Sequence, residues 1–172
     1  MRIREFTLPD PAALNACLYT RFQELSGTGR VRQTHHFAGR FENTYIDASE
    51  IPEIAAVLDA FRQQAAQWLD VAADTLKAGF WFNAMGAGHV TSPHHHDEND
   101  ELLSAVYYIR VPANSGELIL YDGDRPVTVQ PEEGKLVMFG PDVMHEVTVN
   151  NSPELRLSVG MNVGPVEESG CV

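Results

Sequence analysis

Three consecutive histidines, His94, His95 and His96, are the residues of this chain best suited to chemistry. Asp97 and Glu98 follow directly, so five side chains that bind transition metals lie next to one another. In a β-strand, side chains two residues apart point to the same face. The pairs that share a face are His94 with His96, His95 with Asp97, and His96 with Glu98. Each pair could bind one metal ion if a third ligand comes from elsewhere in the chain.

His145 is the candidate for that third ligand. It opens a predicted strand directly after the apolar segment 134–144. In a jelly roll, such a strand can return beside the strand that carries the histidine run. Two histidines and one carboxylate on a shared face leave coordination positions open, which is the arrangement of oxygen-activating non-haem iron. A zinc site closed by four protein ligands would leave no such position.

Length and composition indicate one globular domain, residues 1–172. The hydrophobic share of 44% and the charged share of 21% are typical of a globular protein. A net charge of -12 disfavours nucleic acid and anionic membranes as partners. No apolar segment approaches the roughly 20 residues of a membrane span, and Cys17 and Cys171 lack metal-finger spacing. We therefore expect a cytoplasmic protein that acts on a small molecule.

The elements that must position the histidines fall into two parts. In residues 1–78, apolar residues at helical spacing predict helices over 14–25 and 51–69, with Asp10 and Ser49 as N-caps. In residues 79–165, short β-rich segments separated by turn residues predict a double-stranded β-helix, the cupin-like jelly roll. The predicted strands are 80–83, 89–96, 102–111, 117–121, 127–129, 135–139, 145–149 and 155–163. The fold class is thus mainly β with supporting N-terminal helices.

The segment from Phe80 to Pro165 resembles the 2-oxoglutarate and iron(II)-dependent oxygenase superfamily, in particular its small bacterial and phage-type members. The matching pieces are residues 80–83, the histidine run, 103–109, 134–145 and 156–162, in the order of that family. The resemblance implies that His95, Asp97 and His145 form the iron triad, through the family's His-x-Asp pattern. Pro93 directly before His94, and the spacing from Gly88, favour His94 with His96 instead. The pairing therefore stays open.

The same resemblance implies where 2-oxoglutarate binds. Arg156, followed by Leu157 and Ser158, matches the Arg-x-Ser element that holds the distal carboxylate of this cosubstrate. A planar guanidinium suits that task because it can form two parallel hydrogen bonds to a carboxylate. Tyr108 and Asn83 match positions from which related enzymes contact the same molecule. The implied cofactors are Fe(II), 2-oxoglutarate and O2.

The predicted activity is hydroxylation of a small metabolite or amino-acid-like substrate, with release of succinate and CO2. The basic stretch Arg30, Arg32, His35, His36 and Arg40, together with Trp81, could line the mouth of the site and pair with a substrate carboxylate, although such residues are more often ordinary surface charges. Two alternatives are a cupin-type metalloenzyme that does not use 2-oxoglutarate and a non-catalytic jelly-roll binding module. An exposed strand edge could also pair two copies into a homodimer.

Overall fold

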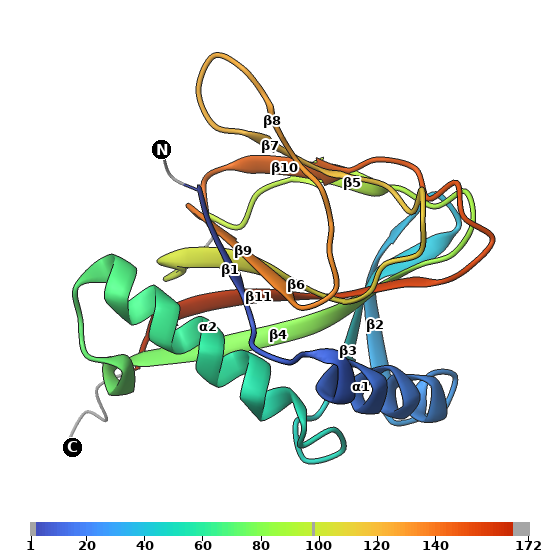
Figure 1. Ribbon diagram of the computed structural model, residues 1–172, viewed down its shortest axis with the longest axis horizontal. Coiled ribbons are helices and arrows are strands. Elements are labelled where there is room, and N and C mark those ends of the chain that lie inside the picture. Colours follow the sequence, from blue (N-terminus) through green and yellow to red (C-terminus); the bar gives the residue numbers. More distant parts are fainter. Residues whose placement is uncertain (1–2, 98, 167–172) are drawn as a thin grey trace.

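Two facing β-sheets form the centre of the molecule, and both helices lie on the far side of the larger sheet (Figure 1). The computed structural model describes residues 3–97 and 99–166. Its elements are β1 (Ile3–Thr7), α1 (Ala12–Leu25), β2 (Val31–Phe37), β3 (Arg40–Ile46), α2 (Ile54–Leu69), η1 (Ala73–Thr75), β4 (Leu76–Met85), β5 (Thr91–His94), β6 (Leu103–Arg110), β7 (Leu118–Tyr121), β8 (Val127–Val129), β9 (Lys135–Phe139), β10 (Met144–Val147) and β11 (Arg156–Pro165).

The sheet order confirms the predicted double-stranded β-helix. The larger sheet has seven strands in the order β1-β9-β6-β11-β4-β3-β2, and the smaller has four in the order β5-β10-β7-β8. Neighbouring strands in both sheets run antiparallel. Strands distant in sequence therefore become neighbours, and β5 comes to lie beside β10.

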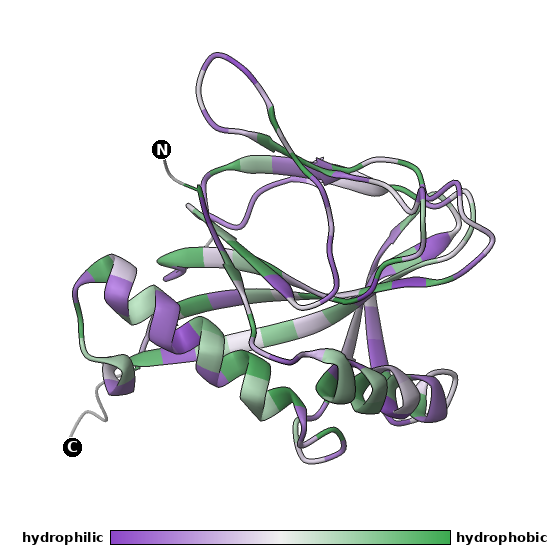
Figure 2. Cartoon of the chain, in the orientation of Figure 1, coloured by the Kyte–Doolittle hydropathy of each residue, from purple (hydrophilic) through white to green (hydrophobic). Residues whose placement is uncertain are grey.

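The two faces of the larger sheet have different tasks, as β11 shows. Leu157, Val159 and Met161 point to one face, where they form the main hydrophobic core with residues of both helices. Arg156 and Ser158 alternate with them and so point to the other face, toward the smaller sheet. Figure 2 shows the matching mixture of hydrophobic and hydrophilic residues along the helices. The alternation on β11 thus separates the structural core from the space between the sheets.

Neither predicted N-cap forms a side-chain capping bond. Helix α2 begins at Ile54 instead of residue 51, and Glu53 at its N-cap position makes no side-chain cap. The hydroxyl and backbone N–H of Ser49 donate instead to Asp47, in a turn that precedes the helix. Asp10 lies before Pro11, which occupies the N-cap position of α1 without a capping bond. Both helices are therefore held by their packed faces more than by their caps.

The N-terminal half contains more strand than the sequence predicts. Strand β1 pairs with β9, and β2 and β3 form a hairpin at the edge of the larger sheet. Predicted strand 89–96 is shorter, because only Thr91–His94 is strand. Among the described residues, no helix is long and apolar enough to cross a membrane. Cys17 is a free, exposed thiol, whereas Cys171 and Glu98 lie outside the described residues.

Candidate metal centre

Three imidazoles, one from β5, one from the segment just after it and one from β10, converge in the space between the sheets. His94 ends β5 and is the direct cross-strand partner of His145 on β10. The ring centroids of these two lie 4.2 Å apart, and the ring of His96 lies 4.9 Å from His94 and 5.1 Å from His145. One ring nitrogen from each residue can be chosen so that all three lie within 4.8 Å of one another. One metal ion between them could contact all three nitrogens at about 2 Å.

Backbone carbonyls fix the tautomers of two of these rings. Nδ1 of His94 lies 2.7 Å from the carbonyl oxygen of Ser92, and Nδ1 of His145 lies 2.9 Å from that of Val143. A carbonyl only accepts hydrogen bonds, so each Nδ1 must carry the proton. The lone pair of each ring is then on Nε2, which is free to bind a metal. The protein thus orients both rings before any ion arrives.

The electrostatics of the site keep two of the imidazoles neutral. Burial, and then the neighbouring histidines, lower the pKa of His96 to about 3. Burial, and then the neighbouring His94, lower the pKa of His145 to about 3, although the hydrogen bond to the backbone carbonyl of Val143 acts in the opposite direction. A protonated imidazole cannot bind a cation, so neutral rings at physiological pH are what a metal centre requires.

The side chains of His95 and Asp97 do not converge with His145. Both side chains are exposed, and the backbone N–H of Asp97 donates to Nδ1 of His95 at 3.3 Å. Neither residue belongs to the group of converging ligand atoms. The geometry instead favours the alternative register, His94 with His96. Glu98, the partner in the third pairing, lies outside the described residues.

Arg156 is a buried cation without an anionic partner. Its side chain is 1% exposed, and Nη1 donates to the carbonyl oxygens of Ser115 and Gly116 at 3.2 and 3.0 Å. Its guanidinium carbon lies 5.2 Å from the centre of the Tyr108 ring. Over residues 3–97 and 99–166, no carboxylate pairs with Arg156, and its Nε has no hydrogen-bond partner. Burying an unpaired charge is costly, so this position suits an anionic ligand.

Two hydroxyls beside this guanidinium are also left without partners. The hydroxyl of Tyr108 and that of Ser115 are buried and form no hydrogen bond within the described part of the chain. Burial raises the pKa of Tyr108 to about 12, although the nearby Arg156 acts in the opposite direction. The phenol therefore keeps its proton and can donate it in a hydrogen bond. A carboxylate bound here would satisfy the unpartnered groups, which is the fit expected for the distal end of 2-oxoglutarate.

A model of the 2OG-Fe(II) oxygenase superfamily matches residues 80–164, the segment that carries the three histidines and Arg156. The chain belongs to the 2OG-Fe(II) oxygenase superfamily. It is therefore an enzyme that uses Fe(II) and 2-oxoglutarate. This membership favours the oxygenase interpretation over the cupin-type enzyme and the non-catalytic module. No sequence match to a curated protein was found.

Several solved structures share the fold over nearly the whole chain. A Pseudomonas putida prolyl-4-hydroxylase is 20% identical with a TM-score of 0.71, over 96% of this chain and 93% of its own. A Trichoplax adhaerens prolyl hydroxylase bound to a hypoxia-inducible-factor peptide fragment is 14% identical with a TM-score of 0.73, over 95% and 83%. The epimerase SnoN, bound to Fe3+, alpha-ketoglutarate and nogalamycin RO, is 14% identical with a TM-score of 0.73, over 95% and 78%. At these identities the likeness describes the fold alone.

A small cavity inside this oxygenase connects the histidines to the inner face of β11. Its volume is about 50 Å³, and the three histidines, Asn83 and Ser158 are among its lining residues. Asn83 accepts a hydrogen bond from Arg40 at 3.1 Å and donates one to Thr91 at 3.1 Å. Both polar atoms of the Asn83 amide are therefore already engaged. Ser158 is two residues from Arg156 on the same strand face, so the cavity and the guanidinium lie on the same side of β11.

A larger pocket of about 300 Å³ opens on the other side of the histidines. Its lining includes His94, His96, Trp81, Tyr45, Glu42 and Glu101. Glu42 and Tyr45 were not predicted, because both lie on β3, within residues 30–48, where the mixed sequence indicates strand and loop without fixing the bounds of a strand. The alternation of Arg40, Glu42, Thr44 and Ile46, all buried, is the strand signal in that stretch.

The arginines of the basic stretch do not line this pocket. Arg30 forms an exposed ion pair with Glu50, and Arg32 stacks over the ring of Tyr45 at 4.0 Å. Arg40 is buried beside the metal-binding strand. Of the basic stretch, the pocket includes His35, whose Nδ1 lies 3.1 Å from the Asn43 amide nitrogen. The idea that these arginines pair with a substrate carboxylate is therefore not supported.

Proposed function

We propose that this protein is an iron(II), 2-oxoglutarate-dependent dioxygenase whose metal ligands are His94, His96 and His145. The observation that carries the proposal is the convergence of three imidazoles on a cavity that Ser158 also lines, two residues from a buried guanidinium that lacks an anion. Arg156 would bind the distal carboxylate of 2-oxoglutarate. The proposal replaces the family's His-x-Asp pairing by His-x-His.

Each residue of the site then has a defined task. When bound, the iron supplies oxidising chemistry, in which 2-oxoglutarate is converted to succinate and CO2 while O2 is consumed and a substrate C–H bond is hydroxylated. Nε2 of His94 and His145 would hold the ion from the smaller sheet. Arg156 and the protonated hydroxyl of Tyr108 would orient the cosubstrate. Phe139, a buried residue whose ring centroid lies 4.8 Å from that of His145, forms part of the apolar lining of the cavity.

A centre of three neutral imidazoles changes the charge of the site. A ligand set with one carboxylate would leave a net charge of one positive unit around Fe(II), whereas three imidazoles leave two. The dianion 2-oxoglutarate would bring one carboxylate to the iron and the other to Arg156, which lowers the combined charge of iron and guanidinium from three positive units to one. Low local dielectric strengthens this attraction, because the cavity is buried between the sheets. Three neutral ligands are therefore compatible with tight binding of the cosubstrate.

The larger pocket indicates the kind of prime substrate. Its lining contains the aromatic rings of Trp81 and Tyr45 and the carboxylate of Glu101, whereas the charge of Glu42, which also lines it, is balanced by Arg40. Among the described residues, the lining includes no lysine or arginine. Carboxylates and aromatic faces attract cations and hydrogen-bond donors and repel anions. We therefore propose a small metabolite with a neutral or basic group, such as an amine, in place of an acidic one.

Formation of succinate tests the function without knowledge of the substrate. Purified protein supplied with Fe(II), 2-oxoglutarate and O2 should form succinate slowly, and candidate amines should accelerate this more than candidate acids. Arg156→Ala should abolish the activity at low 2-oxoglutarate concentration. Arg110→Ala is the control, since Arg110 is an exposed residue paired with Glu154. Failure of the unaltered protein to convert 2-oxoglutarate, with or without candidate substrates, would contradict the proposal.

A further inference from the structure

Strand β5, which carries the first histidine of the centre, has a backbone partner on one edge only. It is the outer strand of the smaller sheet and pairs with β10. That pairing is brief and irregular, since it joins His94 to His145 and Thr91 to Val147 with a register shift between them. An edge strand of four residues held in this way should be mobile unless something covers its free edge.

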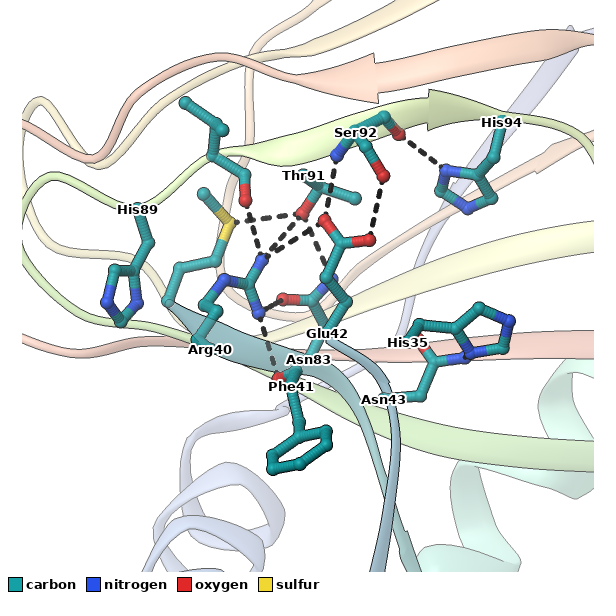
Figure 3. Close-up of polar contacts among 12 residues, drawn as sticks. His35, Arg40, Phe41, Glu42, Asn43, Asn83, His89, Thr91, Ser92 and His94 are labelled. Carbon is teal, nitrogen blue, oxygen red and sulfur yellow. Dashed lines mark hydrogen bonds and ion pairs between the residues drawn. The ribbon is translucent and has the colours of Figure 1, made fainter. Parts of the chain in front are cut away.

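Two charged side chains of β3 cover that edge. Glu42 accepts two hydrogen bonds from Ser92, one from the backbone N–H and one from the hydroxyl, both at 2.8 Å. Arg40 donates to the carbonyl oxygen of Val90 at 2.8 Å and to the hydroxyl of Thr91 at 3.0 Å. Figure 3 shows both side chains between β3 and the start of β5. They take the place of the strand partner that β5 lacks.

The two side chains depend on each other. Both are buried, with 7% of Arg40 and 6% of Glu42 exposed, and Nη2 of Arg40 lies 3.8 Å from Oε1 of Glu42. Burial lowers the pKa of Arg40, and the charge of Glu42 counters that effect. Removing either charge would leave the other buried without a counter-charge. The pair therefore acts as one unit.

This unit connects directly to a metal ligand. Glu42 fixes Ser92 through its N–H and its hydroxyl, and the carbonyl oxygen of the same Ser92 accepts the hydrogen bond from Nδ1 of His94. A shift of Ser92 would therefore turn the imidazole of His94. Residues that hold the non-coordinating nitrogen of a ligand histidine commonly affect metal affinity by about 10–100-fold.

We infer that Glu42 and Arg40 are positioning residues for the metal centre: they clamp β5 to the β2–β3 hairpin and set the orientation of His94 through Ser92. Because Glu42 also lines the larger pocket, the clamp joins the wall of that pocket to the metal ligand. The inference rests on the proposed function for the presence of a metal. The clamp itself can be tested in the metal-free protein.

Glu42→Gln is the decisive variant. A glutamine offers one acceptor oxygen where the carboxylate offers two, and it carries no charge to balance Arg40. We expect amide exchange in residues 91–94 of the metal-free protein to become faster. We also expect the dissociation constant for Co(II), a substitute for Fe(II) that resists oxidation by air, to rise about tenfold or more. The visible spectrum of the bound ion should also change.

Glu50→Gln is the matched control, because it removes the same charge from the exposed ion pair with Arg30. It should leave the exchange and the Co(II) affinity unchanged. If Glu42→Gln does not fold, Ser92→Ala decides the question. That variant removes one hydroxyl contact, and we expect it to weaken Co(II) binding about two- to tenfold.

The outcomes separate this inference from the proposed function. Unchanged Co(II) affinity and spectrum in Glu42→Gln, or in Ser92→Ala if the former does not fold, would overturn the positioning role even if exchange were faster. Failure of the unaltered protein to bind any metal would overturn the proposed function instead. Faster exchange in Glu42→Gln but not in Glu50→Gln would then still support the clamp.

Discussion

At the scale of single residues, the two neighbouring tyrosines of β6 illustrate how one strand serves both the core and the site. The hydroxyl of Tyr107 donates to Oδ1 of Asn15 at 2.7 Å, within the core beneath the helices. The hydroxyl of Tyr108 points to the opposite face and has no partner among the described residues. Burying a hydroxyl without a partner lowers the stability of the folded protein, so its retention points to a ligand.

Replacing each tyrosine by phenylalanine should therefore have opposite consequences. Tyr107→Phe should lower the free energy of unfolding by about 1–3 kcal/mol, because Asn15 loses its buried partner. Tyr108→Phe should not lower it, yet should weaken 2-oxoglutarate binding about two- to tenfold, the effect of one hydrogen bond. Urea unfolding and anaerobic 2-oxoglutarate titration measure the two quantities. Loss of stability in Tyr108→Phe without loss of affinity would contradict a cosubstrate role.

The choice of metal ligands is also a question about residues. The sequence shows that histidines two apart in a strand share a face, but both faces of the predicted strand 89–96 carry candidate ligands, and spacing cannot say which face points inward. The pairing of His94 with His145 decides this in the structure. Arg156 could be named from the sequence through its Arg-x-Ser element, and His145 because it directly follows the apolar segment 134–144. His96 and His94 could be named only as an alternative.

Alanine substitutions across the histidine run should separate the two pairings. We expect His94→Ala, His96→Ala and His145→Ala each to abolish stoichiometric Fe(II) or Co(II) binding, since each removes one of three ligands. His95→Ala and Asp97→Ala, at exposed positions, should retain it. Metal content measured after dialysis, on protein without a histidine tag, gives the answer. Loss of metal in Asp97→Ala would restore the His-x-Asp pairing.

At the scale of elements, close packing between β4 and β11 fixes the wall of the larger pocket. Trp81 is the cross-strand partner of Gly160, and its indole lies where a side chain at Gly160 would have to be. The same indole lines both cavities and lies 5.2 Å from the ring of His96. Gly160 therefore allows an aromatic wall to lie close to the metal centre.

Gly160→Ala should displace the indole of Trp81. Forcing a methyl group into a packed contact typically costs about 1–3 kcal/mol, so the melting temperature should fall. The tryptophan fluorescence should also change as the ring moves. Gly79→Ala on β4, the strand that carries Trp81, is the control, because a methyl group there meets no neighbour within 4 Å. Equal effects of the two substitutions would show that Gly160 has no special packing role.

Hydrophobic patterns predicted some strands of this fold but not β2 and β3. The strands of the double-stranded β-helix are apolar on at least one face, and their approximate positions could be predicted from that pattern. Strand β2 is mostly exposed, and the buried face of β3 begins with Arg40 and Glu42. A strand whose buried positions carry charged residues lacks the alternation of hydrophobic and polar residues from which strands are predicted. These two are buried because their partners, Ser92 and Val90, come from a distant part of the chain.

At the scale of the whole molecule, the buried histidines link folding to pH. The pKa values of His96 and His145 are about 3 in the folded protein, below the ordinary histidine value of 6.5. Between these values the unfolded chain binds more protons than the folded one, so protonation favours unfolding. The free energy of unfolding should thus rise with pH in this window and level off above about pH 6.5.

For the metal-free protein, we expect stability to fall as pH decreases from 6.5 to 5. The slope should reach at most about 1.4 kcal/mol per pH unit for each histidine. His145→Asn removes one of these groups and should make the slope smaller. His36→Asn, at an exposed position, is the control and should leave the slope unchanged. Urea unfolding at several pH values measures it, and a slope that His145→Asn does not alter would contradict the burial argument.

The most direct test of the account is anaerobic addition of Fe(II) and then 2-oxoglutarate, with the visible absorption spectrum recorded. The unaltered protein should develop the absorption band of the iron(II)–2-oxoglutarate chelate at one equivalent of each. His145→Ala should lack the band, and Arg156→Ala should show it only at far higher 2-oxoglutarate concentration. Absence of the band in the unaltered protein, or its full retention in His145→Ala, would contradict the central claim that these residues form the iron and 2-oxoglutarate site.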